Sequence, residues 1–265
     1  MNRIEEYYNY RYDEWGRLLR HRIEYEMTKR ALDKYISPNS SVLDVGGGPG
    51  RYSIYLAQKG HEVTLVDFSE KLVEQAAENS KNAGVTLKDC IHGNALYLDK
   101  ILPDRQFDAV LCMGPMYHLL EESERRQAIE QCMIKLKAGG ILIVSFISAY
   151  APLLDCLGHF PEAVLKDKDN LLGYLNDGRH VAEPDDAFTD AYFFNPMEID
   201  KFMADFKLDK IRIFATDCYA PLVEGKLMEL PEEIFQSWID VFEQISANTE
   251  ILGCCEHILY IGRKV

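Results

Sequence analysis

Seven residues, Asp44-Val45-Gly46-Gly47-Gly48-Pro49-Gly50, join a short apolar segment (41–45) to a segment of helical character (51–59). Glycines in such a turn let the backbone take positive φ angles and let a ligand approach where a Cβ would block it. The helix that follows turns its free N–H groups and the positive end of its dipole toward the same loop. These residues therefore predict a strand, a ligand-binding loop and a helix in succession.

Apolar and amphipathic segments alternate along most of the chain. Strands are expected at 41–45, 63–66, 86–91, 107–113, 141–147, 208–218 and 257–263. Helices are expected at 51–59, 69–82, 123–136, 196–206 and 231–248, with Ser69 capping the second and Trp238 on the apolar side of the last. Strands this apolar, separated by helices, are typical of a parallel sheet that is covered on both faces.

The pattern of apolar, aromatic and turn-forming residues divides the chain into four parts. Residues 1–36 have helical spacing and many aromatic side chains, which predicts an N-terminal helical cap. Residues 37–150 are expected to form an α/β core that binds a ligand, with a turn at 137–140 before its last strand. Residues 151–195 mix short helical pieces with Gly, Pro and Asp and are expected to form an inserted lid, after which 196–265 complete the core.

Composition excludes several classes of function. The chain has 265 residues, and 47 % of them are hydrophobic, so it can bury a core. Its net charge of −14 disfavours nucleic acid and anionic membranes as partners, because they are also negatively charged. The N-terminus lacks an apolar leader, and the longest apolar run (141–154) is shorter than the ~20 residues of a spanning helix. Seven cysteines without CxxC spacing indicate reduced thiols, no metal site and a cytoplasmic location. The oligomeric state is not predicted.

Two acidic residues indicate what the glycine loop binds. Asp67 ends the second expected strand, about 20 residues beyond the glycines, where a carboxylate can accept both hydroxyls of a ribose. Asp44 precedes the glycines, where it can receive an ammonium group and would repel a pyrophosphate. Arg51 stands where a dinucleotide-binding loop has its third glycine. This pattern favours S-adenosylmethionine (SAM) over a dinucleotide; the alternatives are a tight turn without a ligand and, for Asp67, an acid that merely stabilises a helix N-terminus.

Two further loops follow strand ends. Asn94 comes after the weak third strand and can pair with an adenine, although Gly-Asn is also an ordinary turn. Tyr117 and His118 follow the strand at 107–113 and are expected to face the site, because ligands lie beyond the carboxyl ends of parallel strands. His118 is a candidate base, and an equal alternative is that it holds the loop or lines the pocket.

In this order, the segments resemble the class I (Rossmann-like) SAM-dependent methyltransferases. Residues 44–50 resemble the first motif of that family, Asp67 its strand-two acid and 107–118 its fourth motif. Residues 136–140 resemble the turn into strand five, with Ala138 where the family usually has Pro.

The resemblance implies a doubly wound, mostly parallel seven-stranded sheet with one antiparallel strand near the C-terminal edge, and SAM as methyl donor. It implies that the glycines line the methionine moiety, that Asp67 holds the ribose and that Phe68 and the loop at Asn94 meet the adenine. The family commonly has Asp where this chain has Asn94. The expected cofactor-binding residues are Asp44, Gly46, Gly47, Gly48, Gly50, Asp67, Phe68, Asn94, Ala95, Cys112 and Met113.

The expected activity is methyl transfer to a small molecule through an N, O or C nucleophile. Tyr117 and His118 are the candidate catalytic residues, and Tyr8, Tyr12 and Arg17 are candidates to contact the ligand from the N-terminal cap. The cap and the insertion at 151–190 are expected to close together over both substrates. An acidic insertion favours a neutral or cationic acceptor. The alternatives are a protein or RNA methyltransferase, a SAM-binding regulator without turnover and an NAD-dependent oxidoreductase.

Overall fold

The computed structural model describes residues 3–183, 186 and 188–265, which fold around one seven-stranded sheet. The strand order is β3-β2-β1-β4-β5-β9-β8, and the short strands β6 and β7 pair separately. The strands are β1 (Ser41–Val45), β2 (Glu62–Asp67), β3 (Asp89–His92), β4 (Phe107–Cys112), β5 (Leu136–Ile147), β6 (Arg179–His180), β7 (Ala191–Tyr192), β8 (Leu208–Ala215) and β9 (His257–Lys264).

The register places the carboxyl ends of the first strands at one edge of the sheet. Val45 of β1 pairs in parallel with Val66 of β2 and with Cys112 of β4. The chain leaves β1 toward β2 on one side and later returns to β4 on the other, so the topology reverses beside β1, where open α/β sheets bind ligands. Of the seven strands only β9 runs antiparallel, to both β5 and β8, which confirms the expected doubly wound, mostly parallel sheet.

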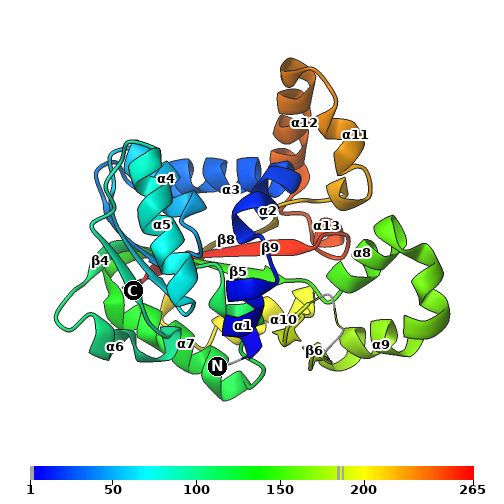
Figure 1. Cartoon of the computed structure of the whole chain (residues 1–265), viewed down its shortest axis with the longest axis horizontal. Coiled ribbons are helices and arrows are strands. Elements are labelled where there is room, and N and C mark those ends of the chain that lie inside the picture. The colour runs from blue at the N-terminus through cyan, green and yellow to red at the C-terminus, as the bar shows by residue number, and fades with distance from the viewer. Residues whose placement is uncertain (1–2, 184–185, 187) are drawn as a thin grey trace.

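Helices cover both faces of the sheet, with α3, α4 and α5 above it and α6, α7 and α10 below it in Figure 1. The helices are α1 (Arg3–Tyr10), α2 (Glu14–Arg20), α3 (Arg22–Tyr35), α4 (Arg51–Gln58), α5 (Glu70–Asn82), α6 (Leu98–Ile101), α7 (Glu122–Lys135), α8 (Ala151–His159), α9 (Val164–Asp177), α10 (Pro196–Met203), α11 (Glu224–Met228), α12 (Glu232–Ile245) and α13 (Thr249–Leu252). Successive residues of each strand enter opposite cores: Leu142 and Val144 of β5 belong to one, Ile141 and Ile143 to the other. This two-sided burial is why the strands are almost continuously apolar.

The N-terminal cap is three helices and not one continuous helix. The chain turns at residues 11–13, where the side chain of Asp13 accepts a hydrogen bond from the Gly16 amide (3.0 Å) and begins α2. A second break at His21 separates α2 from α3. Because of these breaks, α1 and α2 reach the edge of the sheet where β1, β2 and β4 end.

Two smaller expectations were wrong. The expected turn at 137–140 is the irregular beginning of β5, which starts at Leu136 and shifts register beside Phe107. Trp238 is 43 % exposed, because the inner face of α12 is formed by Phe235, Ile239 and Phe242.

Two general properties follow from the described residues. Within them, no helix combines the length and the apolar character that crossing a bilayer would need. All seven cysteines are free thiols in this structure.

Candidate functional site

A cavity lies at the carboxyl ends of β1, β2 and β4, between the glycine loop and the helices α1 and α2. Most of the residues expected from the sequence line it: Asp44, Gly46, Gly47, Gly48, Asp67, Phe68, Asn94, Ala95, Met113, Tyr117, His118, Tyr8 and Arg17. Gly50, Cys112 and Tyr12 are not brought to this cavity. Gly50 caps α4 and faces Ala76, Cys112 is fully buried, and Tyr12 stacks on Tyr7 at 5.3 Å.

The glycine loop is held against both neighbouring strand ends. The Gly46 amide donates to the carbonyl of Val66 at 2.8 Å. A Cβ on Gly46 would lie 2.7 Å from Cδ of Pro115, in the loop after β4. Gly46 and Gly48 have φ angles of 72° and 53°. The close approach and the positive φ angles both require glycine here, so the loop presents bare backbone to the cavity.

Two buried carboxylates stand behind this loop. Asp67 accepts the Gly48 amide on Oδ2 and the Ser69 amide on Oδ1, each at 2.8 Å, so it ties the loop to the end of β2. Asp44 accepts the hydroxyl of Ser53 at 2.7 Å. Burial raises the pKa of each carboxyl to about 6. Each carboxylate keeps lone pairs for further donors, and bound positive charge or hydroxyl donors would stabilise the ionised forms.

Asn94 is positioned by its own backbone. Its Oδ1 accepts the Leu96 amide at 2.9 Å and so caps the short 3₁₀-helix at 95–97. The amide NH₂ group of the side chain has no hydrogen bond to the described residues and is available to a ligand acceptor.

His118 links three segments of the chain. Its Nδ1 lies 3.1 Å from the carbonyl oxygen of Asp190, and its Nε2 lies 2.8 Å from the hydroxyl of Tyr8 on α1. Burial lowers the pKa of His118 to about 4, so the ring is neutral near pH 7. Because a carbonyl only accepts, Nδ1 carries the proton and Nε2 accepts from Tyr8. Both ring nitrogens are occupied, which favours the role of holding the loop over that of a free base.

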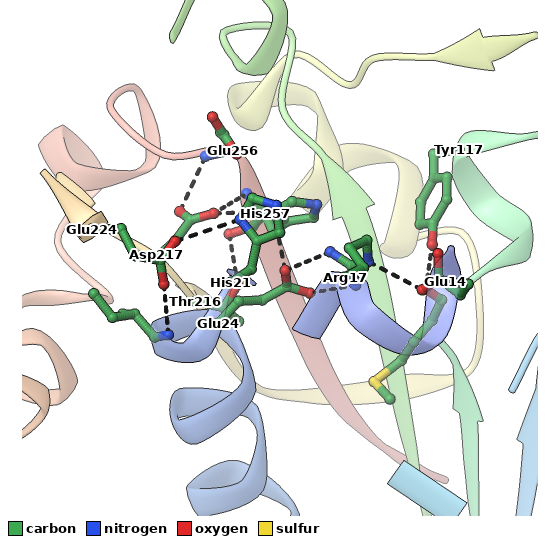
Figure 2. A network of polar contacts seen from close by, with 12 residues as sticks. Glu14, Arg17, His21, Glu24, Tyr117, Thr216, Asp217, Glu224, Glu256 and His257 are labelled. Atoms are coloured by element: carbon green, nitrogen blue, oxygen red, sulfur yellow. Dashed lines mark hydrogen bonds and ion pairs between the residues drawn. The ribbon is translucent and has the colours of Figure 1, made fainter. Parts of the chain in front are cut away.

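A chain of charged side chains runs from Glu14 and Arg17, which line the cavity, to His257 at the start of β9, as Figure 2 shows. Arg17 donates from Nε to Glu14 (3.1 Å) and from both terminal nitrogens to Glu24 (2.7 and 3.0 Å). Glu24 lies 3.7 Å from Nδ1 of His257, which in turn contacts Asp217 at 3.0 Å. Burial opposes the charge on Glu24, but Arg17 and His257 lower its pKa to about 2.

Sequence reasoning missed Glu14 and Arg51 as cavity residues. Arg51 donates twice to the carbonyl of Trp15 (2.9 and 2.7 Å) and lies 3.7 Å from the centre of its ring, which fastens α2 to the start of α4. The available signal was the absence of the third glycine, which freed this position for a long side chain.

The insertion contributes to the site only indirectly. No described residue of 151–190 lines the cavity, and the expectation that the insertion closes with the cap over both substrates stays a prediction. Instead the insertion holds α1: Arg3 donates to the Ala182 carbonyl (2.9 Å), and Phe188 packs edge-on against Tyr7 at 5.9 Å.

Comparison with known proteins identifies the central part of the chain. Residues 42–140 match a family model described as a methyltransferase domain. This part of the chain is therefore similar to a methyltransferase domain. Glycine/sarcosine N-methyltransferase of Parasynechococcus marenigrum (strain WH8102) is 33 % identical over 50 % of this chain and 47 % of that protein. Human glycine N-methyltransferase is 35 % identical over 39 % of each chain, so the chain spans under half the length of these relatives.

Solved structures agree with the class I fold over nearly the whole chain. Magnesium protoporphyrin IX methyltransferase from Synechocystis PCC 6803, with bound S-adenosylhomocysteine (SAH), superposes with a TM-score of 0.59 at 16 % identity, over 99 % of this chain and 98 % of that one. The N-methyltransferase NodS from Bradyrhizobium japonicum WM9 gives 0.59 at 11 % identity, over 99 % of both chains. At these identities the likeness shows the fold of the domain and nothing of its acceptor.

Proposed function

We propose that this chain is a SAM-dependent methyltransferase that methylates the nitrogen of a small molecule. The observation that carries the proposal is the position of Asp67, which lines the cavity while both of its oxygens hold backbone amides at the glycine loop. The match of 42–140 to the methyltransferase domain supports SAM as the donor, and the names of the N-methyltransferase relatives favour nitrogen as the acceptor atom.

The residues of the cavity fit SAM. The bare backbone at Gly46 and Gly48 leaves room for the methionine part, and Asp44 is a buried carboxylate that can receive its ammonium group. Asp67 has lone pairs for the two ribose hydroxyls, and Phe68 lines the cavity next to it with an apolar ring. When bound, SAM supplies a methyl group to the lone pair of the acceptor nitrogen, and the electrons of the broken C–S bond stay on sulfur in SAH.

The chain's own residues then have the task of orienting the acceptor and excluding water. The helices α1 and α2 cover the cavity and are fastened by Arg51 to Trp15 and by Tyr8 to His118. Alignment of donor and acceptor in a closed site can supply most of the rate enhancement of such a transfer. His118, with both nitrogens bonded, acts here as a positioning residue.

Equilibrium dialysis with labelled SAM tests the proposal. Wild type is expected to take up one equivalent and to form SAH with small amines. Asp67→Ala removes the group that both holds the loop and faces the ribose, so uptake should fall by at least tenfold, because hydrogen bonds to charged groups contribute roughly 1.5–3 kcal/mol. Asp89→Ala, at the partly exposed start of β3, is the control and should bind like wild type. No uptake by folded wild type, or full uptake by Asp67→Ala, would contradict the proposal, whereas uptake without SAH formation would favour a regulatory protein.

The partners and location follow from charge and thiol chemistry. A net charge of −14 disfavours a nucleic acid as acceptor, and seven free thiols support a reducing compartment such as the cytoplasm.

A further inference from the structure

The direction of one hydrogen-bond chain determines what the cavity can accept. The carbonyl of Asp190 takes the proton of His118 Nδ1, and the other ring nitrogen therefore takes the proton of the Tyr8 hydroxyl. The hydroxyl oxygen of Tyr8, a residue that lines the cavity, is left with lone pairs and no free proton. Toward a substrate, Tyr8 is consequently an acceptor of hydrogen bonds.

A second tyrosine of the cavity, Tyr117, also donates its hydroxyl proton to a partner within the protein. The hydroxyl of Tyr117 donates to the carbonyl of Met113 at 2.9 Å, and a carbonyl can only accept. The rings of Tyr8 and Tyr117 both contact the ring of His118, with centroids 5.3 and 4.7 Å from it. Both tyrosines line the cavity, and the hydroxyl proton of each is already donated to a partner within the protein.

The charged side chains beside these tyrosines are also unfavourable to anions. Glu14 lies over the glycine loop, where its Cγ would be 3.5 Å from a Cβ on Gly48. Glu5 and Glu124 add two further acids to the lining. The cation at this end, Arg17, already faces the carboxylates of Glu14 and Glu24, and a substrate carboxylate would have to compete with a paired geometry of 2.7 and 3.0 Å.

We propose that the acceptor is an amine without a carboxylate group, whose N–H groups are received by the oxygens of Tyr8 and Tyr117 next to Glu14. A primary amine is an ammonium ion near pH 7, and it must lose its third proton to water before it can react. The neutral amine then has two N–H bonds and one lone pair, so binding both N–H groups to acceptors leaves the lone pair for the methyl group, and the products are a methylammonium ion and SAH. This acceptor differs from glycine and sarcosine, which the relatives' names specify and which both carry a carboxylate. The inference rests on the proposed methyl-transfer function and deepens it by naming the substrate class.

Binding measured without turnover tests the inference. The protein is saturated with SAH and titrated calorimetrically with matched pairs: ethylamine against alanine, and 2-phenylethylamine against phenylalanine. Each amine should bind at least about tenfold more tightly than its carboxylate-bearing partner, since the carboxylate would meet Glu14 beside an Arg17 that is already paired, while Arg51, the other arginine of the lining, is held at the Trp15 carbonyl. Equal or tighter binding of the amino acids, or no amine binding to the SAH-saturated protein, overturns the inference.

Substitutions assign the effect to the named residues. Tyr8→Phe should weaken amine binding by about tenfold, the loss of one hydrogen bond to a strongly polar group, and the SAH affinity measured beside it shows how far the lost Tyr8–His118 bond disturbs the cover of the cavity. Tyr10→Phe, on the same helix at a residue that is 70 % exposed, is the control and should change neither. Wild-type amine affinity in Tyr8→Phe contradicts the assignment.

Charge is tested separately by Glu14→Gln, which keeps an acceptor for Arg17 and removes the negative charge. The preference for the amine over its amino acid partner should shrink by about tenfold, whereas Glu6→Gln, an equal change of charge at an exposed residue of α1, should leave it unchanged. The ratio of amine affinity to amino acid affinity, measured in Glu14→Gln and in wild type, decides the inference even if Tyr8→Phe does not fold. Failure of the proposed function looks different, because wild type would then take up neither SAM nor SAH.

Discussion

Replacing His257 by Gln should remove a defined pH dependence from the stability of the protein. Although burial works against a charged ring, the carboxylates of Glu24 and Asp217 raise the pKa of His257 to about 9, from 6.5. In the unfolded chain those carboxylates are no longer fixed beside the ring. This difference corresponds to about 3 kcal/mol of stability from the protonated ring.

The sign follows from the direction of the shift. A pKa that is raised on folding stabilises fully below the unfolded value, near pH 6.5, and the contribution is lost as the pH rises through about 9. Gln at this position has no charge at any pH, although its amide can still donate to Asp217. The difference in unfolding free energy between wild type and His257→Gln should therefore shrink by about 3 kcal/mol between pH 6.5 and pH 10.

Urea denaturation under reducing conditions, followed by circular dichroism at intervals of half a pH unit, measures this difference. Comparing the variant with wild type at each pH cancels the titration of groups elsewhere in the chain. The control is His159→Gln, because the side chain of His159 is 56 % exposed and its ion pair, among the residues that the structure describes, is with Asp155 of the same helix α8. Its curve should run parallel to wild type. If His257→Gln also runs parallel to wild type, within about 0.5 kcal/mol, the coupling between the ring and the two carboxylates does not exist as described.

Two further predictions concern the segments that surround the cavity. Gly178→Ala should destabilise the protein by about 2 kcal/mol or more in urea unfolding, because the φ angle of Gly178 is 69° and a Cβ there would lie 2.2 Å from the Phe193 carbonyl oxygen. The control is Gly173→Ala, in open space within α9, which should stabilise the protein by up to about 1 kcal/mol. Equal effects of the two substitutions would refute the steric argument. Arg51→Lys should speed amide hydrogen exchange in α2 at least tenfold, because an ammonium group cannot reproduce both the hydrogen bonds to the Trp15 carbonyl and the stacking on the Trp15 ring. Unchanged exchange rates would mean that other contacts hold the helix.

The sequence predicts those features that depend on local chemistry. Strand β1 has the expected bounds, since an apolar run that ends in glycines has few other structures. Ser69 caps α5 as expected, with its hydroxyl 3.1 Å from the Leu72 amide. Asp67 lies where its spacing from the glycines placed it, because the lengths of one helix and one strand fix that separation. The position of Asp67 is therefore readable from a single sequence, whereas Cys112, which also ends a strand, is fully buried and does not line the cavity.

Residues that cover the site are not readable in this way. Glu24 and His257 are more than 200 positions apart in the sequence, and no local sequence pattern predicts that their side chains come into contact. The Tyr8 hydroxyl meets His118 only because the chain breaks after α1, and a periodic pattern over 1–36 does not show where a helix stops. Trp238 was misplaced for a related reason: α12 has apolar residues on more than one face, and only packing selects the inner one.

The chain of ion pairs that leads to His257 begins on α2, the same helix that lines the cavity. The position of each substitution therefore decides whether an experiment tests substrate recognition or stability. Glu14 and Arg17 are one helical turn apart, and Arg17 bonds both Glu14 at the cavity and Glu24 in the network. Deleting residues 1–30 would remove this pair and also the fully buried core residues Ile23 and Met27 of α3. A truncated protein that lost SAM binding would therefore not distinguish a missing lid from a damaged core. Substitution at Glu14 changes the charge that a substrate meets, whereas substitution at His257 changes the far end of the same chain of ion pairs. Because the two sites lie at opposite ends of one network, comparing them separates recognition from stability, which truncation cannot do.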